Sequence, residues 1–200
     1  MINITNLHAR LAKCEFRSDT TVIHVCAFDE EAVTKFNTSL NAAISSGQTL
    51  VPVVIDSYGG HVHSLMAMAD MIRSCPVPVA TVAEGKAMSC GAFLLSFGTP
   101  GYRFMGQNAS VMIHEVTNGK WGKVEEIVAA ADETRRLNAL AFQLLDSNCG
   151  QELGYFQRII HERSHADWYL TPEEVLSHGL VDHIRIPQLV TTVSVRTELL

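Results

Sequence analysis

Short runs of β-branched and apolar residues alternate along this chain with segments in which apolar residues recur every three or four positions. The first pattern is typical of strands buried on both faces, and the second of helices that bury one face. Strands are therefore predicted at 20–27, 50–56, 78–84 and 109–115, and helices at 29–47, 62–75, 89–97, 123–147, 151–165 and 171–179. This alternation predicts an α/β fold with a largely parallel sheet flanked by helices.

Residues that start and stop helices agree with these boundaries. Asp29 is placed to cap the first predicted helix. Thr171 and Glu174 have the spacing of a capping box around Pro172, and Gly179 would close that helix.

The composition predicts one soluble domain. Of the 200 residues, 47% are hydrophobic and 18% are charged, which is ample material for a single core. The net charge of -6 comes from scattered residues, so no basic stripe indicates nucleic acid and no polybasic segment indicates a membrane. We therefore expect a protein or peptide partner.

Location is also predicted from composition. No apolar run reaches the roughly 20 residues that span a bilayer, and no leader pattern is recognised. The five cysteines include no CxxC pair, which favours free thiols in a reducing compartment. The expected location is the cytoplasm.

Ser89 stands directly after a predicted strand and at the first turn of a short apolar helix. The commonest role of serine there is a helix cap, worth about 1 kcal/mol. The alternative is a nucleophile, because such a turn presents the hydroxyl outward beside the unpaired amides of the helix. The GxSxG elbow is only half matched, since Ala87 replaces its first glycine, so that particular fold is not indicated.

Two further features accompany this serine. Gly59 and Gly60 end a buried strand, where backbone amides can face a ligand without an intervening side chain. His114 ends another apolar strand, where a base would be rigidly held. Each alone is a weak signal, because paired glycines are usually a turn and a lone histidine is usually structural.

Three segments closely resemble the family of Clp proteolytic subunits, which are self-compartmentalising serine peptidases. They are DSYGG at 56–60, AMSCGAFLLSFGTPGYRF at 87–104 and NASVMIHE at 108–115. The spacings from Gly60 to Ser89 and from Ser89 to His114 match the family pattern without a gap. YLTPEEVLSHGLVD at 169–182 resembles the closing segment of the family, and the resemblance covers about residues 20–184.

The resemblance implies a serine endopeptidase that needs no cofactor and no metal. Ser89 would be the nucleophile and His114 the base, with the amides of Gly60 and Cys90 as the oxyanion hole. His61 and Val62 would bind the backbone of an extended substrate as an added strand.

The resemblance also implies the architecture and the assembly. We expect crotonase-like repeated βαβ units in a peptidase domain at 20–184, preceded by an axial-gate segment at 1–19 and followed by a tail at 185–200. The helix at 123–147 would be the protruding handle of a homo-oligomer, a heptamer or double heptamer. An AAA+ unfoldase would supply unfolded polypeptide substrates.

The third member of the triad is ambiguous in this sequence. In the family an aspartate stands in a DTDRD-like segment, and alignment backwards from YLT places Arg163 at the triad position and Asp167 at the second aspartate. Asp167 is the favoured orienting carboxylate, with Glu162 and Asp182 as alternatives. This departure leaves open a second hypothesis, a non-catalytic or weakly active ring subunit that supports a partner peptidase.

HERSH, at 161–165, matches the HExxH signature of zinc peptidases. A catalytic zinc site needs a helix through His165, a third protein ligand and an open position. ADWYLTP breaks the helix at once, and no third ligand follows at close spacing. A polar helix end is therefore the favoured interpretation of His161 and His165, with a zinc protease as the minor alternative.

Overall fold

The computed structural model describes residues 20–190, and the compact unit considered below runs from Thr21 to Pro187. The predicted axial-gate segment, 1–19, lies outside the described residues, as does most of the predicted tail. No helix in the described part is long and apolar enough to cross a membrane.

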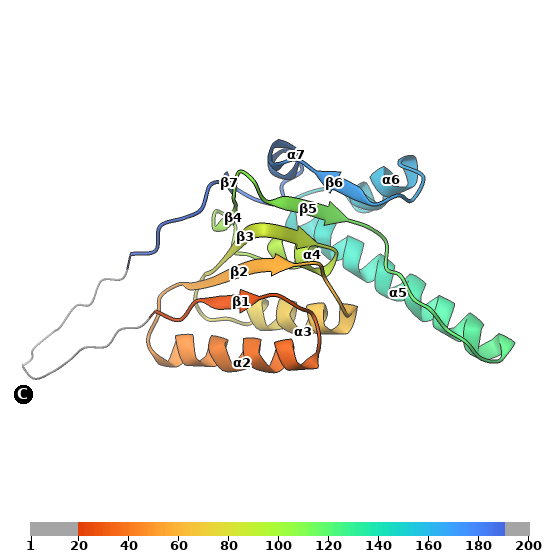
Figure 1. The fold of residues 1–200 in the computed structure, drawn as a ribbon, viewed down its shortest axis with the longest axis horizontal. Helices are drawn as coiled ribbons and strands as arrows, with labels where there is room; N and C mark the ends of the chain where they lie inside the picture. Colours follow the sequence, from red (N-terminus) through yellow and green to blue (C-terminus); the bar gives the residue numbers. More distant parts are fainter. Residues whose placement is uncertain (1–19, 191–200) are drawn as a thin grey trace, which may run out of the picture. The chain divides into compact units, whose positions relative to one another are not determined.

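The predicted alternation of strands and helices is observed (Figure 1). The strands are β1 (Ile23–Val25), β2 (Val51–Ser57), β3 (Val79–Met88), β4 (Arg103–Met105), β5 (Ser110–Ile113), β6 (Trp168–Leu170) and β7 (His183–Ile184). The helices are α2 (Glu30–Ser45), α3 (Val62–Arg73), α4 (Cys90–Leu95), α5 (Val124–Asn148), α6 (Tyr155–Glu162) and α7 (Pro172–Ser177). The strands β4, β6 and β7 are too short for a periodic pattern and had no predicted counterpart.

The seven strands form one sheet with a long central strand. The main path is β1-β2-β3-β4-β7, and all of its pairings are parallel. The first half of β3 pairs with β4, whereas its second half pairs in parallel with β5. Only β6 runs antiparallel, beside β5. The prediction of a mostly parallel sheet flanked by helices is confirmed.

Alternation along β2 explains how the helices pack. Val51, Val53 and Ile55 are fully buried and belong to the main core, together with residues of α2, α3 and α4. Leu50 and Val54 point to the opposite face, where they join a smaller cluster. Figure 1 shows α2 and α3 beside β1 and β2, while α5 extends past the strand ends.

The predicted helix caps are observed. The Asp29 carboxylate accepts a hydrogen bond from the Ala32 amide at 2.7 Å. Thr171 and Glu174 exchange the two bonds of a capping box, at 2.8 and 3.3 Å. These local signals could be recognised in the sequence because both partners of each bond lie within one helical turn.

The helix predicted at 151–165 is shorter than expected. It begins after Gly154, which has a left-handed φ of 85°, and ends at Glu162. Ser164 and His165 then adopt positive φ angles of 59° and 60°. This left-handed pair reverses the chain into β6, which no helical period could have predicted.

Candidate active site

Ser89 joins β3 to α4 in an uncommon backbone conformation. Its φ and ψ are 53° and -123°, and its amide donates to the Met112 carbonyl at 2.8 Å. A positive φ in a residue with a side chain costs energy and persists only where the surrounding structure imposes it. Ser89 occupies the N-cap position of α4, but its hydroxyl makes no capping bond, so the interpretation of this hydroxyl as a helix cap is wrong.

His114 follows β5, which lies beside the second half of β3. The parallel register pairs Met88 with Met112, so the residues that follow each strand emerge at the same edge of the sheet. The Nε2 atom of His114 lies 2.8 Å from the Oγ atom of Ser89. The structure therefore brings together the predicted nucleophile and base at hydrogen-bond distance, as nucleophilic catalysis requires.

Two glycines let the backbone pass close to the serine. The φ angles of Gly59 and Gly60 are 105° and 153°. A Cβ atom on Gly59 would lie 2.6 Å from the Cβ of Ser89, and one on Gly60 would lie 2.5 Å from the Phe28 carbonyl oxygen. Any larger residue would displace either the serine or the strand end.

The predicted oxyanion donors line the same pocket as Ser89 and His114. Within residues 20–190, the amides of Gly60 and Cys90 donate to no backbone carbonyl, which leaves both N–H groups able to face a ligand. The Cys90 thiol donates to the Gly60 carbonyl at 3.3 Å and so ties the two donor segments together. Burial raises the pKa of this thiol, which keeps it protonated for that bond.

The predicted substrate-binding residues lie at the start of α3. Val62 lines the pocket. The His61 side chain is exposed, its amide donates to the Phe28 carbonyl at 2.8 Å, and its own carbonyl accepts from Ser64 at 3.1 Å. The backbone of His61 is therefore engaged, and the binding of an extended substrate here stays a prediction.

Comparison with known proteins agrees with this geometry. A family model described as Clp protease matches residues 19–188 of the chain. The chain belongs to the Clp protease family. It is 34% identical over 130 residues to the ATP-dependent Clp protease proteolytic subunit of Mesostigma viride, and the aligned region covers 65% of this chain and 55% of that protein. The chain thus spans about half the length of this curated relative.

In this Clp protease chain, Asp167 immediately precedes β6, the strand that pairs with β5. The antiparallel pairing of β5 with β6 ends at Ile113 and Trp168, and continuing the register by one residue sets His114 opposite Asp167. Opposed residues of such a ladder have Cβ atoms about 5 Å apart. No hydrogen bond joins the two side chains within the described residues, so the orienting role of Asp167 stays a prediction.

The alternative carboxylates are placed differently. Asp182 accepts hydrogen bonds from the Arg103 side chain at 2.6 and 3.1 Å and from the Gly101 amide at 2.8 Å. Burial by itself would raise the pKa of Asp182, but the Arg103 bonds outweigh it and hold that pKa below its ordinary value. Glu162 is the exposed last residue of α6, and no bond joins it to His114 in the part of the chain that the structure describes.

Arg163, which an ungapped alignment places at the triad position, has a different role. Its guanidinium carbon lies 5.0 Å from the centre of the Trp168 ring. It therefore packs on the strand that follows, and no bond joins it to His114 within the described residues.

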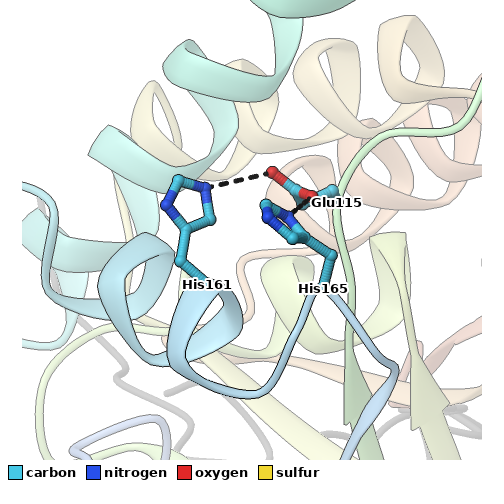
Figure 2. Close-up of side chains that lie close together, drawn as sticks. All are labelled: Glu115, His161 and His165. Atoms are coloured by element: carbon cyan, nitrogen blue, oxygen red, sulfur yellow. Dashed lines mark hydrogen bonds and ion pairs between the residues drawn. The ribbon is translucent and has the colours of Figure 1, made fainter.

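HERSH forms a second polar cluster with a residue that the sequence did not associate with it. Figure 2 shows the side chain of Glu115, which directly follows His114, reaching toward His161 on α6 and His165 on the next loop. One oxygen of Glu115 lies 2.6 Å from the Nδ1 atom of His165, and the other lies 3.6 Å from the Nε2 atom of His161. The i, i+4 spacing of the histidines was visible, but Glu115 is 50 positions from His165, and no local pattern links them.

Proposed function

We propose that this Clp protease chain is a serine endopeptidase that hydrolyses peptide bonds of unfolded polypeptides. The observation that supports this most strongly is the contact of 2.8 Å between Ser89 Oγ and His114 Nε2. The pair lines a pocket with Gly60, Cys90 and Val62.

The proposed reaction follows from these positions. The His114 Nε2 accepts the hydroxyl proton while the Ser89 oxygen attacks the substrate carbonyl. The amides of Gly60 and Cys90 donate to the oxyanion that forms, and each such donor typically lowers the barrier by about 3 kcal/mol. His114 then gives the proton to the leaving amine, and water releases the acyl group by the same steps.

The test is acylation of the intact protein by a fluorophosphonate, together with hydrolysis of a fluorogenic peptide. We expect labelling of the wild type at Ser89, with loss of both labelling and hydrolysis in Ser89→Ala. The matched control is Ser74→Ala, an exposed serine after α3, which should behave as the wild type. Equal rates for Ser89→Ala and the wild type would contradict the proposal.

We further propose that α5 is the handle of an oligomeric ring. It is 25 residues long. Two strongly exposed apolar side chains mark its N-terminal end: Trp121, just before the helix, is 95% exposed, and Val124, its first residue, is 72% exposed. Large apolar groups gathered in this way usually mark an interaction surface. Val124→Asp should shift sedimentation toward smaller assemblies, whereas the exposed neighbour Glu125→Gln should not.

A heptameric or double heptameric ring fed by an AAA+ unfoldase is the assembly we propose. The matched relative is named as ATP-dependent, which supports an ATPase partner for this chain. The four described cysteines are free thiols, in keeping with a reducing cytoplasm.

A second candidate function is a weakly active or non-catalytic ring subunit. It is favoured by one observation: within the described residues, no side chain bonds the Nδ1 atom of His114, which faces away from Ser89. A triad enzyme without its orienting carboxylate loses up to about 10⁴ in turnover. Peptide hydrolysis by the pure protein that is no faster than by Ser89→Ala would favour this candidate.

A further inference from the structure

We infer that Glu115, His161 and His165 form a binding site for a divalent transition metal, with zinc as the best match. One donor atom from each residue lies within 4.8 Å of the other two. Two imidazole nitrogens and one carboxylate oxygen are a common zinc ligand set. This proposal departs from the sequence-based expectation of no metal, and it assigns no hydrolysis to the ion.

The distances are close to those that a tetrahedral ion needs. Ligand atoms about 2.1 Å from zinc lie about 3.4 Å from one another. The Glu115 oxygen and the His161 Nε2 atom are 3.6 Å apart. The other oxygen is 2.6 Å from the His165 Nδ1 atom, so this pair would open by less than about 1 Å as an ion replaces the shared proton.

The carboxylate is oriented by a residue outside the cluster. The Nδ2 atom of Asn138, on α5, lies 3.5 Å from the Glu115 oxygen that faces His161. The side-chain oxygen Oδ1 of Asn138 in turn accepts a hydrogen bond from the Val116 amide at 2.9 Å. Outer hydrogen bonds of this kind hold metal ligands in position and are part of a built site.

The turn after α6 brings the second histidine back toward the first. The helix ends at Glu162, and the positive φ angles of Ser164 and His165 turn the backbone after it. The imidazole rings of His161 and His165 lie 4.5 Å apart, at an angle of 44°. Strained backbone of this kind is maintained only by the structure around it. Both rings therefore face Glu115, as Figure 2 shows.

The site is open on its outer side. The side chains of His161 and His165 are 51% and 57% exposed, whereas that of Glu115 is 29% exposed. Water or another ligand can therefore complete the coordination. In an HExxH hydrolase the intervening glutamate faces the metal-bound water, but here Glu162 forms no bond with any of the three ligands within the described residues.

The position of the ion suggests what it would do. Glu115 follows His114, and His165 precedes Asp167 by two residues, so the ion would join the two segments just beyond the last pair of the β5–β6 ladder. Metal binding would hold Asp167 near His114. This consequence depends on the proposed peptidase function, whereas the metal site itself does not.

The test uses the full chain after removal of bound metal with a chelator. Calorimetric titration with zinc should give one ion per chain, and cobalt should give the visible absorption of a low-coordinate site. Asn138→Ala should weaken zinc binding by about tenfold, as is typical when a residue that orients a metal ligand is lost. His161→Ala and His165→Ala each remove a ligand and should weaken zinc binding by more than about tenfold. His24→Ala, an exposed histidine on β1, is the matched control and should bind as the wild type.

A second measurement separates the site from the proposed enzyme. Zinc should slow amide hydrogen exchange in the loop at 163–166 of the wild type and leave it unchanged in His165→Ala. Absence of zinc and cobalt binding by the wild type, or binding that survives both histidine substitutions, would overturn the proposal whatever the peptidase activity. Equal melting temperatures of the variants in chelator would show that they remain folded.

Discussion

Both ends of the parallel sheet carry a polar cluster, and the two clusters are built in opposite ways. Where β4 and β7 begin, the Arg103 side chain is only 9% exposed. It donates two bonds to Asp182 and one each to the carbonyls of Asn148 and Gly179. Every charge in this cluster has a partner.

Where β3 and β5 end, several polar groups have no hydrogen-bond partner among the described residues. Ser89 has a strained backbone and no capping bond, and the amides of Gly60 and Cys90 donate to no carbonyl within residues 20–190. His114 is bonded through only one of its ring nitrogens in the same range. This cluster gives up stability to keep its donors and its nucleophile free for a substrate.

The contrast shows how one sheet serves two purposes. The hydrogen-bonded network of Arg103 and Asp182 holds the ends of α5 and α7 against β4 and β7. The cluster of Ser89 and His114 has fewer hydrogen bonds and is held in place by β3 and β5, which it follows. Substitutions at the first cluster should therefore change stability, and substitutions at the second should change activity. Four predictions, in order of decreasing effect, test this division.

The largest effect is expected for Asp167→Asn. If Asp167 orients the His114 imidazole, removing its charge should lower kcat for a fluorogenic peptide by up to about 10⁴ with little change in melting temperature. Glu162→Gln and Asp182→Asn are the controls, because both alternatives lie elsewhere in the structure. An unchanged kcat for Asp167→Asn would show that Asp167 does not orient His114.

Arg103→Met should lower the free energy of unfolding by about 3 kcal/mol, because it leaves the Asp182 carboxylate without its partner. Denaturant titration measures this change. Peptide hydrolysis by the folded fraction should stay close to that of the wild type. A stable variant with a lost activity would contradict the division between the two sheet ends.

Gly59→Ala and Gly101→Ala form a matched pair at the two ends. Both glycines have left-handed backbones, with φ of 105° and 87°, but only at Gly59 would a Cβ meet another atom, the Cβ of Ser89 at 2.6 Å. Displacing the serine should lower kcat/KM by about 10², whereas Gly101→Ala should cost only about 1 kcal/mol of stability. Equal losses of activity in both variants would show that the contact with Ser89 is unimportant.

The smallest expected effect is the pH dependence of the stability that Asp182 contributes. Because the pKa of Asp182 is lowered in the folded state, its stabilising effect is full above the unfolded value of about 3.9 and is lost as the pH falls through the lower folded value. The stability difference between the wild type and Asp182→Asn should therefore shrink between neutral pH and about pH 3. A difference that stays constant would mean that the pair with Arg103 does not perturb this carboxylate.

Local signals predicted most of the fold. The alternation of apolar runs with helical spacing located the major strands and helices, and the caps at Asp29 and Thr171 lie where the pattern placed them. The short strands β4 and β6 were missed because three residues carry no period. The helix end at Glu162 was missed because left-handed residues such as Ser164 depend on their surroundings rather than on their own preference.

Only part of the candidate site could be predicted from the sequence. Family resemblance pointed to Ser89 and His114, which the structure places together, but composition and spacing alone favoured a helix cap for the serine. The same sequence signal that suggested a zinc helix in HERSH contained two of the three clustered residues and omitted Glu115. A third partner that is distant in the sequence cannot be recognised until the chain is folded.

The sequence by itself determined the order of the helices and of the longer strands, the positions of the caps and the glycines that allow close approach, because these depend on neighbours within a few residues. Only the tertiary structure decided that His114 meets Ser89, that the strand containing His114's neighbour Ile113 pairs with Trp168, and that Glu115 lies beside two histidines. These contacts depend on strand register and on a strained turn, which are set by the packing of the whole sheet and not by any one segment.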